Sequence, residues 1–107
     1  MGVRTRDRVG RSRLDTAFRA LASAQRREIL RILGEQSGRS DKTCCAPDEL
    51  CACKLSDRLG LAPSTISHHM TLLREARLVD ARKDGSWVYY RLCRDNLRAV
   101  AEELETL

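Results

Sequence analysis

Aromatic rings and the motifs of catalysis are scarce in this chain. One Trp, two Tyr and one Phe among 107 residues are too few for the stacking surface that binds single-stranded nucleic acid. His68 and His69 are the only histidines, and the chain has no CxxC pair, nucleophile elbow or phosphate-binding loop. We therefore expect that this protein is not an enzyme and needs no resident cofactor.

Long apolar runs are also missing. No stretch approaches the ~18 consecutive apolar residues of a membrane span, and no apolar run follows the charged first residues as in a secretory signal. A length of 107 residues predicts a single domain. We expect a cytoplasmic protein, in a reducing compartment where thiols usually serve metal or redox chemistry.

Basic residues outnumber acidic ones and are unevenly spread. Lys and Arg total 20 against 15 Asp and Glu, a formal charge of +5. Residues 1–13 alone hold five Arg and one Asp, for a net charge of +4. We predict that residues 1–13 form a basic flexible arm and that residues 14–107 fold as the domain.

Periodic apolar residues and turn signals divide the chain. The segments predicted to be helical are residues 14–21, 23–33, 49–59, 63–76 and 97–107. Residues 34–43 are polar and predict a loop, after which Pro47 suits the first position of the third helix. The Asp84-Gly85 pair predicts a hairpin between two β-prone segments, because Gly readily adopts a positive φ.

The two helices joined by residues 60–63 predict a helix-turn-helix, and the hairpin after them predicts a wing. The fold class is therefore mainly α with a small β-hairpin: a winged helix-turn-helix of about five helices and a two-stranded wing. Polar side chains near the start of the second helix lie where a recognition helix contacts base edges. The residues predicted to bind DNA are Ser64, Thr65, Ser67 and His68 on that helix and Arg82 and Lys83 in the wing.

The same helix has an apolar side. Ile66, Met70 and Leu73 recur at helical spacing and predict the face that packs inward. We interpret His69 as a packed histidine rather than a base-contacting one. The alternative for the polar side is that Ser64 and Thr65 only cap the helix and His68 is solvated.

Two runs carry a resemblance to a known family: ELCACKLSDRLGLAPSTISHHMTLLREARLV and DGSWVYYRL. They resemble the ArsR/SmtB family of bacterial winged-helix, metal-responsive repressors, over roughly residues 14–105. The resemblance implies a homodimer that binds double-stranded operator DNA at an inverted repeat and releases it when a toxic metal or metalloid binds. It also implies that Leu14–Leu21 and Leu97–Leu107, which carry apolar stripes, form the dimer interface.

Four of the five cysteines fall within ten residues. Thiolates are soft ligands: three suit As(III) or Sb(III), and four suit Cd(II), Pb(II) or Zn(II). ELCAC resembles the ELCVC of the family's arsenite sensors, which implies As(III) or Sb(III) as the inducer, but a Cd(II)/Pb(II) subgroup shares this motif. The predicted metal ligands are Cys44, Cys45, Cys51 and Cys53.

The chain departs from the family's patterns in three respects. Ser56 stands where the arsenite sensors have a third cysteine. The Cd(II)/Pb(II) sensors take further thiols from an amino-terminal arm, but residues 1–43 of this chain contain no cysteine. We therefore predict that Cys44 or Cys45 completes the site. The zinc sensors' site on the last helix looks absent, because residues 95–107 contain no histidine.

The CxC spacing suggests how binding acts. In a regular helix Cys51 and Cys53 point about 200° apart, so one ion reaches both sulfurs only if the first turn unwinds. We predict that this distortion weakens DNA binding through the helix that follows. Three alternatives remain open: a thiol redox or persulfide sensor, a thiol oxidoreductase or metal carrier, and cysteines that are merely small buried side chains, as we interpret Cys93.

Overall fold

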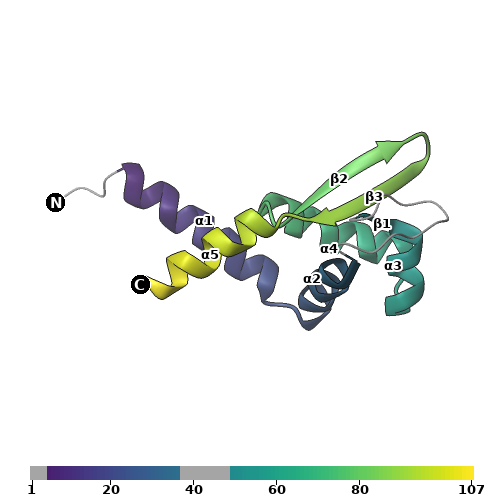
Figure 1. Ribbon diagram of the computed structural model, residues 1–107, viewed down its shortest axis with the longest axis horizontal. Coiled ribbons are helices and arrows are strands. Elements are labelled where there is room, and N and C mark those ends of the chain that lie inside the picture. Colours follow the sequence, from purple (N-terminus) through teal and green to yellow (C-terminus); the bar gives the residue numbers. More distant parts are fainter. Residues whose placement is uncertain (1–4, 37–48) are drawn as a thin grey trace.

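The computed structural model describes the backbone of residues 5–36 and 49–107, and the side chains of residues 13–36 and 49–107. Within these ranges the chain forms five helices and a three-stranded sheet (Figure 1). None of these helices is both long and apolar enough to span a membrane. In chain order the elements are α1 (Thr5–Leu21), α2 (Ala24–Gln36), β1 (Glu49–Cys51), α3 (Ala52–Leu59), α4 (Pro63–Glu75), β2 (Val79–Asp84), β3 (Trp87–Leu92) and α5 (Arg94–Glu105).

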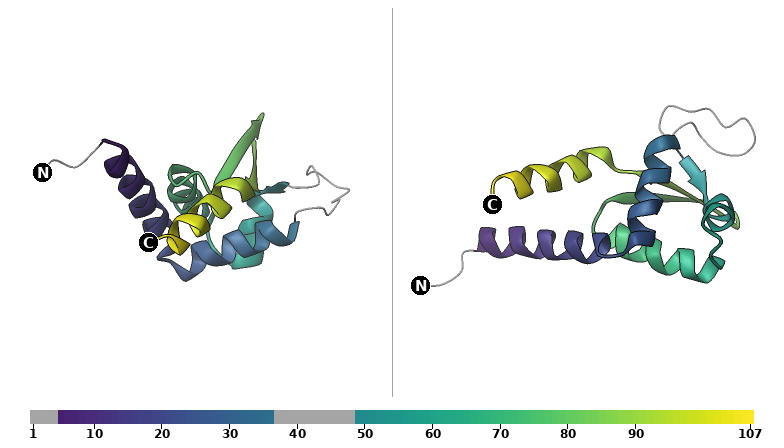
Figure 2. Two further views of the ribbon diagram at one scale, coloured as in Figure 1. Left: turned by 60° about the vertical axis from the view of Figure 1, so that its left-hand side comes forward. Right: turned by 90° about the horizontal axis from the view of Figure 1, so that it is seen from below.

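The terminal helices and the sheet point in different directions. α1 and α5 project from one end of the molecule, and an ion pair of 3.6 Å between Arg13 Nη1 and Glu103 Oε1 links them. The hairpin of β2 and β3 projects away from that end, and β1 and α3 lie at the opposite end of the molecule from α1 and α5 (Figures 1 and 2). The fold is a winged helix-turn-helix, as predicted.

The hydrophobic core draws on every described element. Ile66, Met70 and Leu73 of α4 are buried, which confirms their predicted inward orientation. Burying one such side chain contributes about 1.5–3 kcal/mol, so these three fix α4 against the rest of the domain. The remaining core residues are Ala17, Ala20, Ile29, Leu30, Ile32, Leu33, Leu50, Leu55, Leu78, Val79, Tyr90 and Val100.

The prediction of a helix over residues 49–59 is wrong at its start. Residues 49–51 form β1, which pairs antiparallel with β3 in a sheet of order β1-β3-β2. All three residues of β1 are buried, with Leu50 opposite Tyr90. This long-range pairing outweighs the local helix signal from Pro47 and the acidic residues after it. The helix begins only at Ala52, and the sheet has a third strand besides the predicted wing.

Other helix ends also differ from the predictions, and α5 spans Arg94–Glu105 rather than residues 97–107. α1 begins at Thr5 rather than near Leu14, because arginine is a good helix former and the apolar pattern reports only the buried face. The division of the chain into an arm and a domain stays a prediction. α2 continues through Gly34 to Gln36, which is buried. The predicted hairpin is confirmed, with Asp84 opposite Trp87 and Gly85 at a φ of +61°.

Gly60 ends α3 in the left-handed region, with φ +65°, and its N–H donates to the Ser56 carbonyl. Because an L side chain is strained there, Gly60→Ala should lower the free energy of unfolding by about 1 kcal/mol. Gly34→Ala is the matched control: its Cβ would lie an ordinary 3.7 Å from Leu92 Cδ2, so helix propensity should raise stability by up to about 1 kcal/mol. Urea unfolding measures both, and equal effects would contradict this account of the turn.

Candidate functional site

The turn between α3 and α4 is braced from inside α3. The Ser56 carbonyl accepts hydrogen bonds from the N–H of Gly60 and, at 3.2 Å, from the N–H of Leu61. The Ser56 hydroxyl in turn donates to the Leu61 carbonyl. Ser56, which stands at the family's third-cysteine position, therefore serves the turn that sets α4 relative to α3.

One edge of α4 presents polar groups to solvent. Ser64, Ser67 and His68 are exposed and Thr65 is half-buried. The N-cap of α4 is Ala62, and no side chain caps it, so capping does not account for Ser64 and Thr65. Among the described residues, none of these four side chains has a hydrogen-bond partner. Their hydroxyls and imidazole are available as donors and acceptors for an external ligand.

His69 of α4 is buried against α2, which confirms its interpretation as a packed histidine. Its Nδ1 lies 3.2 Å from Arg26 Nη1 and its Nε2 lies 2.8 Å from Gln25 Oε1. A guanidinium only donates, so Nδ1 accepts and the proton of the neutral ring is on Nε2, which donates to Gln25. Burial, then the charge of Arg26 and then that of His68 lower the pKa of His69.

Arg26 joins α4 to the end of α1. Its Nε donates to the Ala20 carbonyl at 2.7 Å and its Nη2 donates to the Arg19 carbonyl at 3.0 Å. These are carbonyls of the last turn of α1, where a cation is favoured by the helix dipole. The same guanidinium contacts His69. One arginine therefore fixes α1 and α4 against α2.

In the wing, Arg82 is held by a carboxylate from another strand. Its Nε and Nη2 donate to Glu49 Oε2 and Oε1 at 2.9 and 2.8 Å, and its Nη1 lies 3.9 Å from Asp84 Oδ2. The guanidinium carbon lies 4.4 Å from the centre of the Tyr89 ring, a cation–π contact. The hydrogen bonds to Glu49 raise the pKa of Arg82. About half of the Arg82 side chain remains exposed.

Two features at the wing were not predicted from the sequence. Glu49, which contacts the wing from β1, lies in a segment predicted to be helical, and a strand of three residues is too short to show a reliable alternation of polar and apolar side chains. Trp87, opposite Asp84 at the hairpin turn, is 56% exposed, an unusual exposure for an indole. Lys83, predicted to contact phosphates, is exposed.

The CxC thiols lie at the junction of β1 and α3. Cys51 is buried and is the N-cap of α3, in extended conformation with φ −73° and ψ 153°, and Cys53 is exposed. Their Sγ atoms lie 2.7 Å apart. The prediction that a helical turn must unwind before both sulfurs meet is therefore wrong: Cys51 belongs to a strand, so the two sulfurs already converge.

The other predicted ligands, Cys44 and Cys45, lie outside the described residues. Within residues 13–36 and 49–107, no cluster of three or more His, Cys, Asp or Glu side chains is arranged to hold a metal ion. Two converging thiols suit a thiophilic ion in donor chemistry and supply two ligands of such a site.

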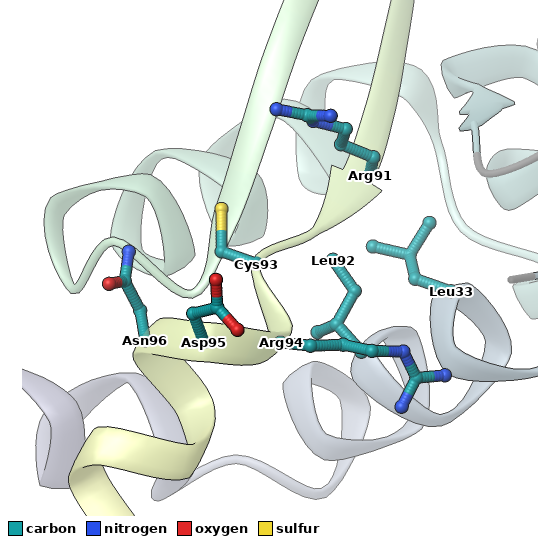
Figure 3. Close-up of a pocket in the computed structure, with 7 residues that line it drawn as sticks. All are labelled: Leu33, Arg91, Leu92, Cys93, Arg94, Asp95 and Asn96. Atoms are coloured by element: carbon teal, nitrogen blue, oxygen red, sulfur yellow. The ribbon is translucent and has the colours of Figure 1, made fainter.

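Cys93 has a different environment. It precedes α5 and lines a cavity of about 360 Å³ with Arg91, Arg94 and Asn96, among others (Figure 3). Burial and the neighbouring Asp80 raise the pKa of its thiol to about 11, so it is protonated at neutral pH and a poor nucleophile or ligand.

Exposed apolar side chains gather on the projecting helices. Phe18 of α1 is 45% exposed, Leu104 of α5 is 41% exposed, and Leu107 beyond α5 is 85% exposed. These segments are those predicted to form the dimer interface.

Comparisons with known proteins identify sequence relatives of this chain. A family model described as "Bacterial regulatory protein, arsR family" matches residues 45–81, from the thiol segment to β2. An uncharacterized HTH-type transcriptional regulator of Methanocaldococcus jannaschii is 31% identical over 90 residues, covering 84% of this chain and 89% of the relative. The arsenical resistance operon repressor of Staphylococcus aureus is 33% identical over 94 residues, covering 88% and 79%.

A solved structure supports the fold. The solution structure of a homodimeric winged helix-turn-helix DNA-binding domain from Mycobacterium bovis superposes with a TM-score of 0.72. The superposition covers 98% of this chain and 87% of the Mycobacterium bovis chain, and the two sequences are 24% identical.

The lowered pKa of His69 predicts a pH-dependent stability. His69 of the unfolded chain, with a pKa of ~6.5, binds a proton more tightly than His69 of the folded chain. The contribution of neutral His69 to the free energy of unfolding is therefore complete above pH ~6.5. It is lost as the pH falls toward the folded-state pKa. Between pH 7.5 and 5.5, urea unfolding should show wild-type stability falling more steeply than that of His69→Gln, by at most ~1.4 kcal/mol per pH unit. The control His68→Gln should keep most of the wild-type slope, because the charge of His68 is the smallest of the three causes that lower the His69 pKa; an unchanged slope in His69→Gln would contradict the assignment.

Proposed function

This chain belongs to the ArsR family of bacterial regulatory proteins, and on that premise we propose that it is a metalloid-responsive transcriptional repressor. It binds operator DNA as a dimer and releases the DNA when As(III) or Sb(III) binds Cys51 and Cys53. The observation that carries the proposal is the pair of Sγ atoms 2.7 Å apart at the start of α3, the helix that leads into α4. The named arsenical resistance repressor among its relatives supports this inducer class.

The DNA-binding surface is the polar edge of α4 together with the wing. Ser64, Thr65, Ser67 and His68 contact bases and nearby phosphates, and Arg82 and Lys83 contact phosphates. The formal charge of +5 favours this partner. A two-fold dimer then binds an inverted repeat whose half-sites are centred about 10 bp apart.

Dimerisation covers the exposed apolar residues of α1 and α5. Phe18 and Leu104 gain burial there, worth about 25 cal/mol per Å² of apolar surface removed from water. The homodimeric domain of Mycobacterium bovis with the same fold supports this assembly.

Binding of the inducer has to move the thiols. Two thiolates bound to one ion through bonds of about 2.3 Å, at an angle of roughly 90–110°, would lie about 3.3–3.8 Å apart, whereas the Sγ atoms here are 2.7 Å apart. An ion bound by both sulfurs would therefore separate them, and in this proposal β1 shifts with Cys51 or α3 shifts with Cys53. Cys44 or Cys45 supplies the third thiolate. A coupling free energy of ~3 kcal/mol between inducer and DNA would weaken DNA binding on the order of 100-fold. The alternative inducers are Cd(II) and Pb(II).

A second candidate, a thiol redox-sensing repressor, is favoured by the same distance. A disulfide needs a sulfur separation of about 2.05 Å, and the 2.7 Å pair is already close. A peroxide would take two electrons and two protons from the two thiols, forming the S–S bond and water. Mass spectrometry after mild peroxide distinguishes the candidates: a reversible Cys51–Cys53 disulfide that abolishes DNA binding supports redox sensing.

Removing either thiol should abolish the response. We expect arsenite to weaken wild-type binding to fluorescent operator DNA on the order of 100-fold. It should leave Cys51→Ser and Cys53→Ser bound, because each variant lacks one of the three thiolates of the proposed site. Cys93→Ser is the control and should respond like the wild type, since its thiol is protonated at neutral pH. Release of the two serine variants by arsenite would overturn the proposed site.

Helix and wing substitutions should act differently on DNA. Ser67→Ala and His68→Ala should change base preference, because their side chains face base edges. Lys83→Ala should weaken all sequences alike and lower the salt slope of log K by about 1. Binding titrations against a panel of inverted repeats at several salt concentrations measure both. An unchanged base preference in both helix variants would show that α4 is not the recognition helix.

A further inference from the structure

The outer face of the sheet connects the thiol strand to the wing. Residues directly opposite in antiparallel strands share a face. Cys51 of β1 is opposite Tyr89 of β3, and Tyr89 is opposite Arg82 of β2. Glu49, two residues before Cys51, is on the same face. One row of side chains therefore runs from a proposed inducer ligand to a proposed phosphate-binding arginine.

The Glu49–Arg82 pair crosses the middle strand. With neighbouring strands about 4.8 Å apart, β1 and β2 are separated by roughly 10 Å, so only a long side chain spans them. Arg82 does so across the Tyr89 ring, 4.4 Å from its centre, and ends on both oxygens of Glu49. The two-point contact fixes the direction of the guanidinium as well as its position.

Glu49 has little freedom to release this partner. It is 7% exposed, and an unpaired carboxylate at that depth is strongly unfavourable. About half of the Arg82 side chain remains exposed, and its Nη1 lies 3.9 Å from Asp84 Oδ2. The carboxylate thus orients the arginine rather than removing it from solvent.

From this arrangement we propose that Glu49 is a positioning residue that transmits the state of the Cys51–Cys53 pair to the wing through Arg82. The proposal rests on the proposed function and adds a second route to DNA besides α3 and α4. β1 has only three residues, so a displacement of Cys51 moves Glu49 with it. In the DNA-binding state Glu49 orients the Arg82 guanidinium toward a phosphate. In the inducer-bound state Glu49 is displaced and this orientation is lost.

The test compares two charge-removing substitutions on the same sheet. Glu49→Gln keeps the size of the side chain and removes its charge. Asp80→Asn is the matched control, because Asp80 pairs with Arg91 at 3.3 Å between β2 and β3, and its side chain is 58% exposed. Affinity for operator DNA is measured with and without arsenite, and the ratio of the two dissociation constants reports the coupling.

We expect Glu49→Gln to bind DNA about fivefold more weakly without arsenite and to lower the coupling ratio at least about fivefold, while Asp80→Asn stays near the wild type. Arsenite uptake, measured as the loss of free thiols, should be the same in both variants as in the wild type. A wild-type ratio in Glu49→Gln, an equal loss in Asp80→Asn, or tighter DNA binding by Glu49→Gln would each overturn the proposal.

A second variant separates positioning from folding. Arg82→Lys keeps the charge for phosphate but cannot form the two-point contact, so it should lose coupling as Glu49→Gln does, and the double variant should lose no more than either single one. Additive losses would overturn the proposal, with thermal melts checking that each variant folds. A wild-type protein that takes up arsenite and stays on DNA would instead overturn the proposed function, and the coupling with it.

Discussion

The pairing of a three-residue strand with the wing is the constraint on which the rest of the site depends. Because residues 49–51 pair with β3, Cys51 is extended where the local sequence favours a helix, and α3 starts one residue later. The extended residue turns one thiol toward the next. The same pairing carries Glu49 to within hydrogen-bond distance of Arg82. Thiol geometry and wing geometry thus have a common origin.

Much of the fold follows from local signals that the sequence displays. The α4 helix, its inward Ile66, Met70 and Leu73, and the Gly85 hairpin are each encoded within a few residues. Helical spacing and turn chemistry suffice for them. The burial of His69 was also predictable, but its partner Arg26 was not, since the two are 43 positions apart in the chain.

The candidate site was less predictable because it depends on contacts between distant segments. The meeting of the Cys51 and Cys53 sulfurs follows from β1, and β1 exists only because of β3, about 40 residues later. Glu49 has no distinctive signal of its own for the same reason. The predicted ligands Cys44 and Cys45 lie outside the described residues, so their part in the site stays a prediction.

The unequal exposure of the two sulfurs has a kinetic consequence. Cys53 faces solvent, whereas Cys51, the last residue of β1, is only 1% exposed. An incoming reagent collides with Cys53 first and reaches Cys51 only by an intramolecular step, at the high local concentration that tethering provides. In the proposed response, the outer sulfur would govern the rate of capture and the inner one the residence time, so the speed and the persistence of that response could change independently.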